Sequence, residues 1–134
     1  MDQQVIAQGN GHLAANPKTR VLHDLCNEMV RIYKEIFGRG PTRTRADWAG
    51  RDALLCTLED SLTPAERKMV EVGEHQRLME TRMFFQHVCE DDFRESVERI
   101  TGRKVRAFVS GIDTDTDVSS EVFYLEQVVD SASK

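Results

Sequence analysis

The sequence predicts an α+β domain, a four-stranded antiparallel sheet made of two hairpins, with two to three helices packed on one face. Two long segments, 17–37 and 63–102, carry apolar residues at helical spacing. Between and after them lie pairs of short segments rich in strand-forming residues. These pairs are 42–48 with 53–58, and 104–110 with 121–125. The expected order of elements is therefore α-β-β-α-(α)-β-β.

The chain of 134 residues is expected to form one domain. We place that domain at residues 17–128. Residues 1–16 are rich in Gln, Gly, Asn and Ala, which is typical of a flexible N-terminal tail. Residues 129–134 are expected to be a frayed C-terminus.

The first helix has clear signals at both ends. Asn16 suits the N-cap, and Pro17 suits the first helical position because its fixed φ is already helical. Gly38 suits a left-handed C-cap, and Pro41 prevents the helix from continuing. Arg31 and Glu35 are spaced to form an ion pair on the outer face.

The segment 63–102 also begins and ends at recognisable signals. Thr63-Pro64-Ala65-Glu66 is a capping box, and Gly102 suits a left-handed C-cap. An unbroken helix of this length would span about 57 Å. A globule of this chain length is only about 35–40 Å across. The break candidates are Gly73 and residues 89–92, and we expect a long first piece, a kink near residue 90 and a shorter second piece.

The strand segments differ in character. Threonine and arginine alternate in 42–48, whereas 53–58 is almost entirely apolar. In 104–110, the alternation predicts Val105, Ala107 and Val109 on one face and Phe108 on the other. Residues 113–120 are expected to form the loop of the second hairpin.

Composition excludes some functional classes. The net charge of −5 argues against nucleic-acid binding by bulk electrostatics. No apolar run approaches the ~20 residues needed to cross a bilayer, and the N-terminus shows no secretory signal pattern. The three cysteines have no CxxC spacing, which favours reduced, buried thiols in a cytoplasmic protein.

No motif predicts a metal, a cofactor or catalysis. Asp113-x-Asp115-x-Asp117 opens like a calcium loop, but Val118 and Tyr124 stand where that loop needs Gly and Glu. An acidic hairpin loop is therefore favoured over a calcium site. The four histidines have no metal-binding spacing, and no nucleophile–base pair can be named. We expect a protein that is not an enzyme, with no bound cofactor or metal.

The arginines give the only candidate binding site. Gly38-Arg39-Gly40-Pro41 is favoured as a helix cap and turn, with an anion or partner contact as the alternative. Arg82 lies mid-helix among apolar residues, where its charge is costly unless it is paired. An ion pair with an acidic neighbour is the favoured alternative for Arg82. The candidate ligand- or partner-binding residues are Gly38, Arg39, Gly40, Arg43, Arg45 and Arg82.

The apolar surface of 63–102 predicts self-association. It is wider than one neighbouring helix and one sheet face would cover, and a homodimer built on Met69, Val72, Met79 and Met83 would bury it. The competing account is a sharp bend at Gly73 or near residue 90 that buries both apolar stripes within the monomer.

Several motifs together resemble a known family. They are Gly38-Arg39-Gly40-Pro41, Leu62-Thr63-Pro64-Ala65-Glu66, Arg82 with Phe84-Phe85, Thr101-Gly102-Arg103-Lys104-Val105, the Asp-rich loop and Val122-Phe123-Tyr124-Leu125. Over roughly residues 17–126 the chain resembles the MpsC-like family, named as a component of a sodium-translocating, membrane-potential-generating system in bacteria.

The resemblance implies a soluble, non-enzymatic accessory or regulatory partner of a membrane transport complex linked to sodium or inorganic-carbon uptake. It implies no catalytic residues. The residues themselves leave a second class open, a small-anion or nucleotide sensor that uses the arginines. An enzyme is the third possibility, and no named motif supports it.

Overall fold

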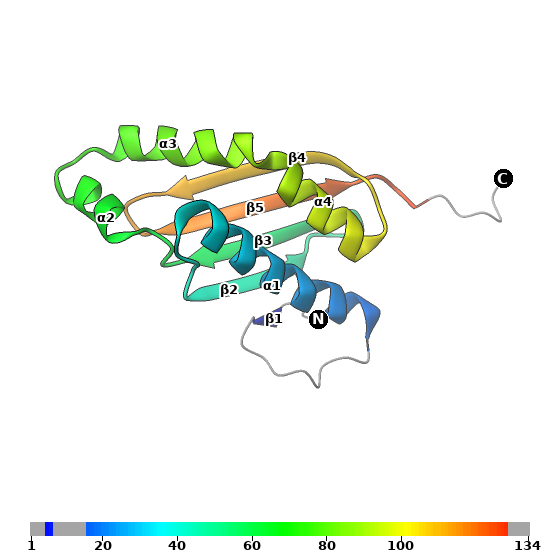
Figure 1. Ribbon diagram of the computed structural model, residues 1–134. Helices are drawn as coiled ribbons and strands as arrows, with labels where there is room; N and C mark the ends of the chain where they lie inside the picture. The colour runs from blue at the N-terminus through cyan, green and yellow to red at the C-terminus, as the bar shows by residue number, and fades with distance from the viewer. Residues whose placement is uncertain (1–4, 7–15, 129–134) are drawn as a thin grey trace.

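The computed structural model describes residues 5–6 and 16–128 (Figure 1). The predicted order of helices and hairpins is confirmed. The elements are β1 (Val5–Ile6), α1 (Pro17–Phe37), β2 (Arg43–Trp48), β3 (Ala53–Glu59), α2 (Pro64–Glu71), α3 (His75–Val88), α4 (Glu90–Thr101), β4 (Val105–Asp113) and β5 (Val118–Leu125). The two-residue strand β1 was not expected, and it lies within the predicted tail. Residues 1–4 and 7–15 of that tail and residues 129–134 lie outside the described residues, whereas Asn16 belongs to the cap of α1.

All neighbouring strands in the sheet are antiparallel, in the order β1-β2-β3-β5-β4. The two predicted hairpins, β2–β3 and β4–β5, are joined into one sheet by pairing of β3 with β5. Figure 1 shows α1 and α4 crossing one face of the sheet, with α3 running beside β4 on the same side. The other face of the sheet is not covered by any helix of the described residues.

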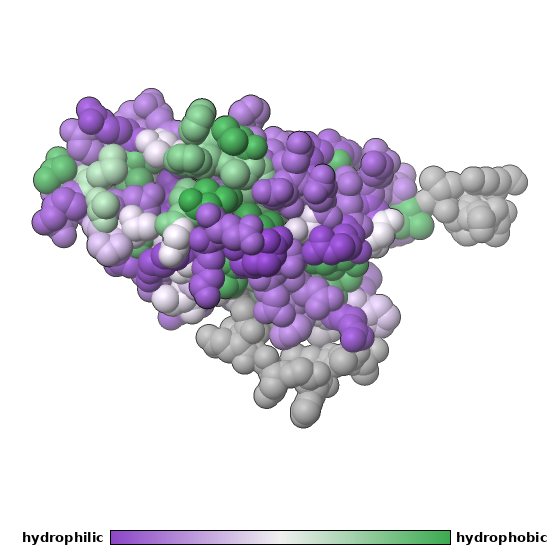
Figure 2. Space-filling view, viewed as in Figure 1, coloured by the Kyte–Doolittle hydropathy of each residue, from purple (hydrophilic) through white to green (hydrophobic). Residues whose placement is uncertain are grey.

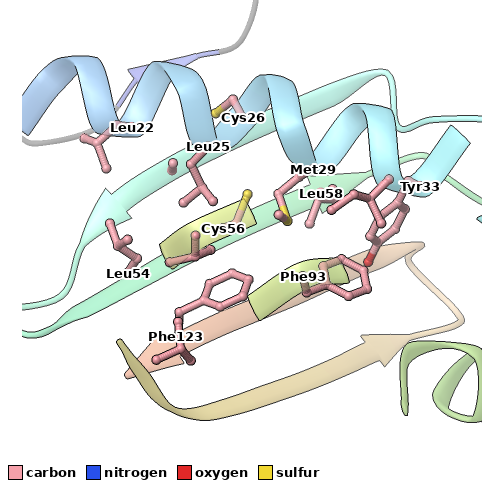
Figure 3. Packing of buried hydrophobic residues seen from close by; sticks show 14 of the residues in the cluster. Leu22, Leu25, Cys26, Met29, Tyr33, Leu54, Cys56, Leu58, Phe93 and Phe123 are labelled. Carbon is pink, nitrogen blue, oxygen red and sulfur yellow. The ribbon is translucent and has the colours of Figure 1, made fainter. Parts of the chain in front are cut away.

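The core lies between that sheet face and the helices α1 and α4 (Figure 3). Because α1 keeps a helical period, one stripe of its side chains is fully buried against alternate residues of β3 and β5. The buried residues include Leu22, Leu25, Met29, Leu54, Leu58, Phe93 and Phe123. At the start of α1, Trp48 Nε1 donates a hydrogen bond to the Lys18 carbonyl oxygen at 3.2 Å.

The predicted helix ends are confirmed. Asn16 caps α1 by accepting from the Lys18 N–H at 2.8 Å, and Gly38 ends it with φ +81°. At the start of α2 the Thr63 N–H donates to Glu66 Oε1 at 2.8 Å, and the Glu66 N–H donates to Thr63 Oγ1 at 3.2 Å. Gly102 ends α4 with φ +71°.

The segment 63–102 breaks twice, so the predicted long first piece is wrong. The break near residue 90 is present at Cys89, between α3 and α4. A further break separates α2 from α3 at Gly73, which has φ +81°. There the Glu74 N–H bonds to the Met69 carbonyl and the Gly73 N–H to the Val70 carbonyl, the double closure of a Schellman motif. These bonds satisfy carbonyls at the end of α2 and stabilise the break.

In β4 the predicted face of Val105 is wrong, whereas Ala107 and Val109 share a face opposite Phe108 as predicted. The pairing of β4 with β5 shifts register between Val105 and Ala107, which marks a β-bulge. The extra residue turns Phe108 toward the core, where its ring stacks on Phe93 at 5.2 Å and on Phe123 at 4.9 Å between centroids. Val109 consequently faces the uncovered side of the sheet and is 54% exposed.

Candidate functional site

The loop after α1 is a helix cap and a close turn. Gly38 has the predicted positive φ, whereas Gly40 does not. A Cβ atom on Gly40 would lie 3.2 Å from both Val30 Cγ1 and Lys34 Cγ, so a side chain there would crowd α1. Gly40 thus favours this close approach, and Gly38 supplies the left-handed conformation.

Arg39 ties this loop to the segment before α2. Its Nη1 donates to the carbonyl oxygens of Asp60 and Leu62, at 2.7 and 2.8 Å. Its Nη2 lies 3.2 Å from Asp60 Oδ2. The Arg39 guanidinium is therefore engaged in holding two loops together.

The side chains of Arg43 and Arg45 lie on the uncovered face of the sheet. Thr44 and Ala46, which alternate with them along β2, are buried on the helix side. Arg43 Nη1 is 3.8 Å from Glu59 Oε1. Arg45 Nε is buried and has no hydrogen-bond partner among the described residues.

Arg82 lies on the helix side of the sheet, in a closed ion pair. Its side chain is 1% exposed, and it contacts Glu66 through Nε at 2.8 Å and Nη2 at 2.6 Å. Nη2 also donates to the Ser61 carbonyl at 3.0 Å and Nη1 to Ser61 Oγ at 3.4 Å. The guanidinium carbon is 3.7 Å from the centre of the Phe37 ring. The structure therefore does not bring Arg82 together with Arg43 and Arg45, and gives Arg82 the acidic partner that was the alternative.

The Glu66 carboxylate serves two purposes at once, since it completes the capping box and pairs with Arg82. Partial burial would raise the pKa of Glu66, but the Arg82 guanidinium and the Thr63 N–H outweigh it and lower that pKa below its usual value. Glu66 therefore stays ionised, and the pair links α2 to α3.

A second buried cluster, which the sequence analysis missed, surrounds Glu121 of β5. The Glu121 side chain is fully buried. The Tyr33 hydroxyl donates to Glu121 Oε2 at 2.5 Å, and Gln86 Nε2 donates to the same oxygen at 2.7 Å. Gln86 Nε2 also lies 3.1 Å from the Tyr33 hydroxyl. In Figure 3 that hydroxyl points from α1 toward the sheet. Three elements, α1, α3 and β5, thus meet at one carboxyl group.

Burial raises the pKa of Glu121 to about 7. The neighbouring Ser110 hydroxyl, and the hydrogen bonds from the Tyr33 hydroxyl and the Gln86 amide, oppose this rise because they favour the ionised carboxylate. Burial and the nearby Glu121 also raise the pKa of Tyr33 well above its ordinary value, so the phenol remains a hydrogen-bond donor. The carboxyl group therefore titrates near neutral pH, inside the core.

The cluster has an excess of polar atoms without partners. Six buried side-chain nitrogen or oxygen atoms of the described residues make no hydrogen bond, and four of them belong to this region. The four atoms are Glu121 Oε1, Gln86 Oε1, Ser110 Oγ and Ser119 Oγ. Gln86 and Ser110 also line a cavity of about 150 Å³ between α3 and β4, together with Met83, His87, Glu90 and Phe108.

One signal in the sequence could have found Glu121. Residues 121, 123 and 125 alternate along β5, so they share a face. Because Phe123 and Leu125 are strongly apolar, Glu121 must lie on the core side with them. Its partners, from α1 and α3, could not be named without the tertiary structure.

The Asp-rich turn is built on backbone hydrogen bonds. Asp113 Oδ1 accepts from the N–H groups of Asp115 and Thr116 at 3.0 Å each. Asp117 accepts from the N–H groups of Ser61 and Leu62 at 3.0 and 3.1 Å. Over the described ranges, no group of three or more His, Cys, Asp or Glu side chains is placed to hold a metal ion.

The outer side of α3 carries an apolar patch. Phe84, Phe85 and Val88, which we name the α3 patch, are 60%, 39% and 59% exposed. Phe85 also packs its ring edge-on to Phe37 of α1, with centroids 6.2 Å apart. Figure 2 shows apolar surface gathered over α3 and the adjoining part of α1. The inner side of α3 is fixed to the protein by Leu78, Arg82 and Gln86, which are buried.

Of the predicted dimer residues, Val72 and Met79 are exposed, at 65% and 37%. Met69 and Met83 are half-buried. The break at Gly73 separates the two that lie on α2 and its C-cap from the two on α3. They therefore do not form a single continuous helical stripe.

None of the helices in residues 16–128 is both long enough and apolar enough to span a bilayer. Searches among curated proteins and among solved structures each found no match. A family model described as "Na+-translocating membrane potential-generating system (MpsC)" matches residues 17–127, from the first residue of α1 to just beyond β5. That match covers most of the chain, and the protein therefore belongs to the MpsC family.

Proposed function

We propose that this chain is a non-enzymatic accessory or regulatory protein of the sodium-translocating system for which its family is named. In this proposal it works on the cytoplasmic side of the membrane and acts by binding. The observation that carries the binding role is the exposed α3 patch. Exposed aromatic side chains clustered on one helix are typical of interaction surfaces.

The α3 patch is a rigid surface. The inner side of α3 is held by the Arg82–Glu66 pair and by the hydrogen bonds of Gln86 to Tyr33 and Glu121. A surface that is fixed before binding loses little conformational entropy when a partner covers it. The fixed position of the α3 patch therefore favours its use as a docking surface for a partner.

We propose that the occupant of the α3 patch is a second copy of this chain. A twofold contact would place Phe84 and Phe85 of one protomer against the same residues of the other, which is the commonest arrangement in homo-oligomers. Offset or edge-on contacts between aromatic rings would add to the burial of apolar area. This retains the homodimer predicted from the sequence but moves its centre from the methionines to the phenylalanines.

Sedimentation at micromolar concentration tests the dimer. We expect a species of twice the 15.3 kDa chain mass, and a monomer for Phe84→Ser. Lys68→Ser is the matched control, because Lys68 lies on α2 with its side chain 71% exposed. A monomeric wild-type chain, or a dimer unaffected by Phe84→Ser, would contradict this interface.

The accessory role is tested in cells that lack the chain. A voltage-sensitive dye should report a weaker sodium-dependent membrane potential in those cells. We expect the wild-type chain and Lys68→Ser to restore the potential, and Phe84→Ser to fail although it is produced and folded. An unchanged potential after deletion would contradict the role in this system.

The alternative of an anion or nucleotide sensor gains no support from the arginines. Arg82 is closed off by Glu66, and Arg43 and Arg45 lie on the other face of the sheet. The hollow beside Arg43 is lined by four carboxylates, of Glu59, Asp60, Asp115 and Asp117, against the two guanidinium groups of Arg43 and Arg67. This excess of negative charge disfavours an anion.

A further inference from the structure

We propose that Glu121, Gln86 and Ser110 form a binding site for a monovalent metal cation, reached through the cavity between α3 and β4. The proposal concerns the interior of the monomer. It is independent of the α3 patch and of the proposed accessory role, and it stands or falls on its own measurements.

The three candidate ligand atoms are all oxygens. They are Glu121 Oε1, Gln86 Oε1 and Ser110 Oγ, and each is buried without a hydrogen-bond partner among the described residues. Leaving a buried polar atom unpartnered destabilises the folded state. Several such costs at one place are unusual in a folded protein and indicate that the oxygens bind something. Carboxylate, amide carbonyl and hydroxyl oxygens are the ligands that hard cations prefer.

The hydrogen bonds that are present hold these oxygens in place. Tyr33 and Gln86 Nε2 both donate to Glu121 Oε2, so Oε1 is left as the free oxygen of an oriented carboxylate. The same bond fixes the Gln86 amide and leaves its carbonyl oxygen free. Ser110 is the direct cross-strand partner of Glu121, so its side chain leaves the sheet on the same face. The site is therefore built on three elements, α3, β4 and β5.

The charges around Glu121 favour a ligand with a single positive charge. Glu121 carries one negative charge when ionised. Of the titratable groups near it, Tyr33 on α1 stays neutral because its pKa is raised, and Cys56, its cross-strand partner on β3, stays neutral for the same reason. Arg82 on α3 is balanced by Glu66. A monovalent cation would neutralise the carboxylate, whereas a divalent ion would leave an uncompensated buried charge and an anion would be repelled.

The cavity supplies a path from solvent. Gln86 and Ser110 belong both to its lining and to the surroundings of Glu121. Its volume of about 150 Å³ exceeds the ~10–15 Å³ that one water molecule requires. A cation could thus keep part of its water shell while it exchanges that shell for protein oxygens. Glu90, on the cavity wall, is held by Arg94 at 2.6 Å and adds little net charge there.

The test is thermal unfolding of the full chain at pH 8. The chlorides of lithium, sodium and potassium are compared with choline chloride at equal ionic strength. We expect at least one metal chloride to raise Tm above the value in choline chloride, in a manner that saturates with concentration. The shift should vanish in Glu121→Gln. Glu28→Gln is the control, because it removes an acidic side chain outside the proposed site, and it should keep the full shift.

Two further measurements keep the proposal falsifiable. If Glu121→Gln fails to fold, Ser110→Ala should still fold and should weaken the cation effect by raising the concentration at half-saturation. Broadening of the sodium NMR signal by the wild-type chain, and its reversal by lithium or potassium, reports binding directly. Equal Tm values in all four salts together with an unbroadened sodium signal would mean that the cavity holds water only, and would overturn the proposal. A shift retained by Glu121→Gln would overturn it as well.

Discussion

Among residues 16–128, two charged side chains are almost completely buried, and they differ in how fully they are partnered. Arg82 uses all three of its guanidinium nitrogens, on Glu66 and Ser61, and lies against the Phe37 ring. Glu121 receives two hydrogen bonds on one carboxylate oxygen and none on the other. The pair around Arg82 is complete within the chain, whereas the cluster around Glu121 is not.

The comparison shows why burial alone does not identify a functional residue. A buried charge with every partner inside the fold holds that fold together. A buried charge with a missing partner weakens the fold unless something else binds there. Both clusters attach to the inner side of α3, through Arg82 and Gln86, so the same helix joins a structural pair to a candidate binding site.

The largest expected effect comes from breaking the complete pair. Arg82→Met should destabilise the protein by about 3–5 kcal/mol, because it leaves the partly buried Glu66 carboxylate without its cation. Urea denaturation at pH 7 measures the change. Arg77→Met is the control on the same helix, since the Arg77 side chain is 73% exposed, and it should change stability by less than about 0.5 kcal/mol. A loss below about 1 kcal/mol for Arg82→Met would mean that the pair is not structural.

A substitution in the Glu121 cluster should have the opposite effect and raise the stability of the protein. The folded-state pKa of Glu121, about 7, lies above the ordinary glutamate pKa of 4.5, so the folded state keeps a proton that the unfolded chain releases between those pH values. The stability that this group contributes is present at low pH and is lost as the pH rises toward 7. In choline chloride, Glu121→Gln should exceed the wild type in stability by roughly 3 kcal/mol above pH 7, and by little near pH 4.5.

Urea titrations of both proteins from pH 4.5 to pH 8.5 measure that difference. Other acidic groups titrate in both proteins, so only the difference between the two curves is informative. Curves that stay parallel over the whole range would show that the carboxyl group of Glu121 does not titrate in this window.

A smaller loss of stability is expected when the capping box formed by Thr63 and Glu66 is broken. Thr63→Ala removes the hydroxyl that accepts from the Glu66 N–H, and it should cost about 0.5–2 kcal/mol. The effect should stay below that of Arg82→Met, because the ion pair survives. Thr81→Ala, an exposed change within α3, serves as the control for urea denaturation. An unchanged midpoint for Thr63→Ala would show that the capping box contributes nothing measurable.

The smallest effect is expected for a pair outside the core. The Arg31 guanidinium, with Ser96 and Arg99, lowers the pKa of Glu28 to about 2, although burial opposes this. The stability from this group is therefore present above pH 4.5 and is lost as the pH falls toward 2. Since the Arg31 side chain is 48% exposed, Glu28→Gln should cost under about 1 kcal/mol at pH 7. Urea midpoints at low and high salt should converge, and a salt-independent loss would contradict a surface pair.

Local signals predicted the boundaries of the helices well. The caps at Asn16, Gly38, Thr63 and Gly102 each depend on residues within a few positions of one another, so the sequence contains the whole motif. The sequence indicated Gly73 as a possible break, but it could not show that the helix ends there. A glycine costs only about 1 kcal/mol within a helix, and its decisive bonds, from Gly73 and Glu74 back to α2, are visible only in the structure.

Features that depend on distant contacts were not predicted. The bulge after Val105 puts that residue on the opposite face of β4 from Ala107 and Val109, and nothing in the alternation of that strand indicates it. For Arg82 the sequence indicated that a partner was needed, and it could not show that Glu66 was that partner, sixteen positions away. The Glu121 cluster joins residues up to 88 positions apart, so its existence follows only from the packing of α1 and α3 on the sheet.

The contact between Trp48 and Lys18 has an optical consequence. Trp48 is the only tryptophan of the chain, so intrinsic fluorescence excited at the indole band reports a single place, where β2 meets the first turn of α1. Tyr33 lies fifteen positions further along the same helix, about 22 Å away at 1.5 Å per residue. Indole emission should therefore change when α1 detaches from β2, and should not change when the cavity beside Glu121 is occupied. Absorbance changes of the buried phenol would follow that occupancy, and the two chromophores together would separate unfolding from binding in one sample.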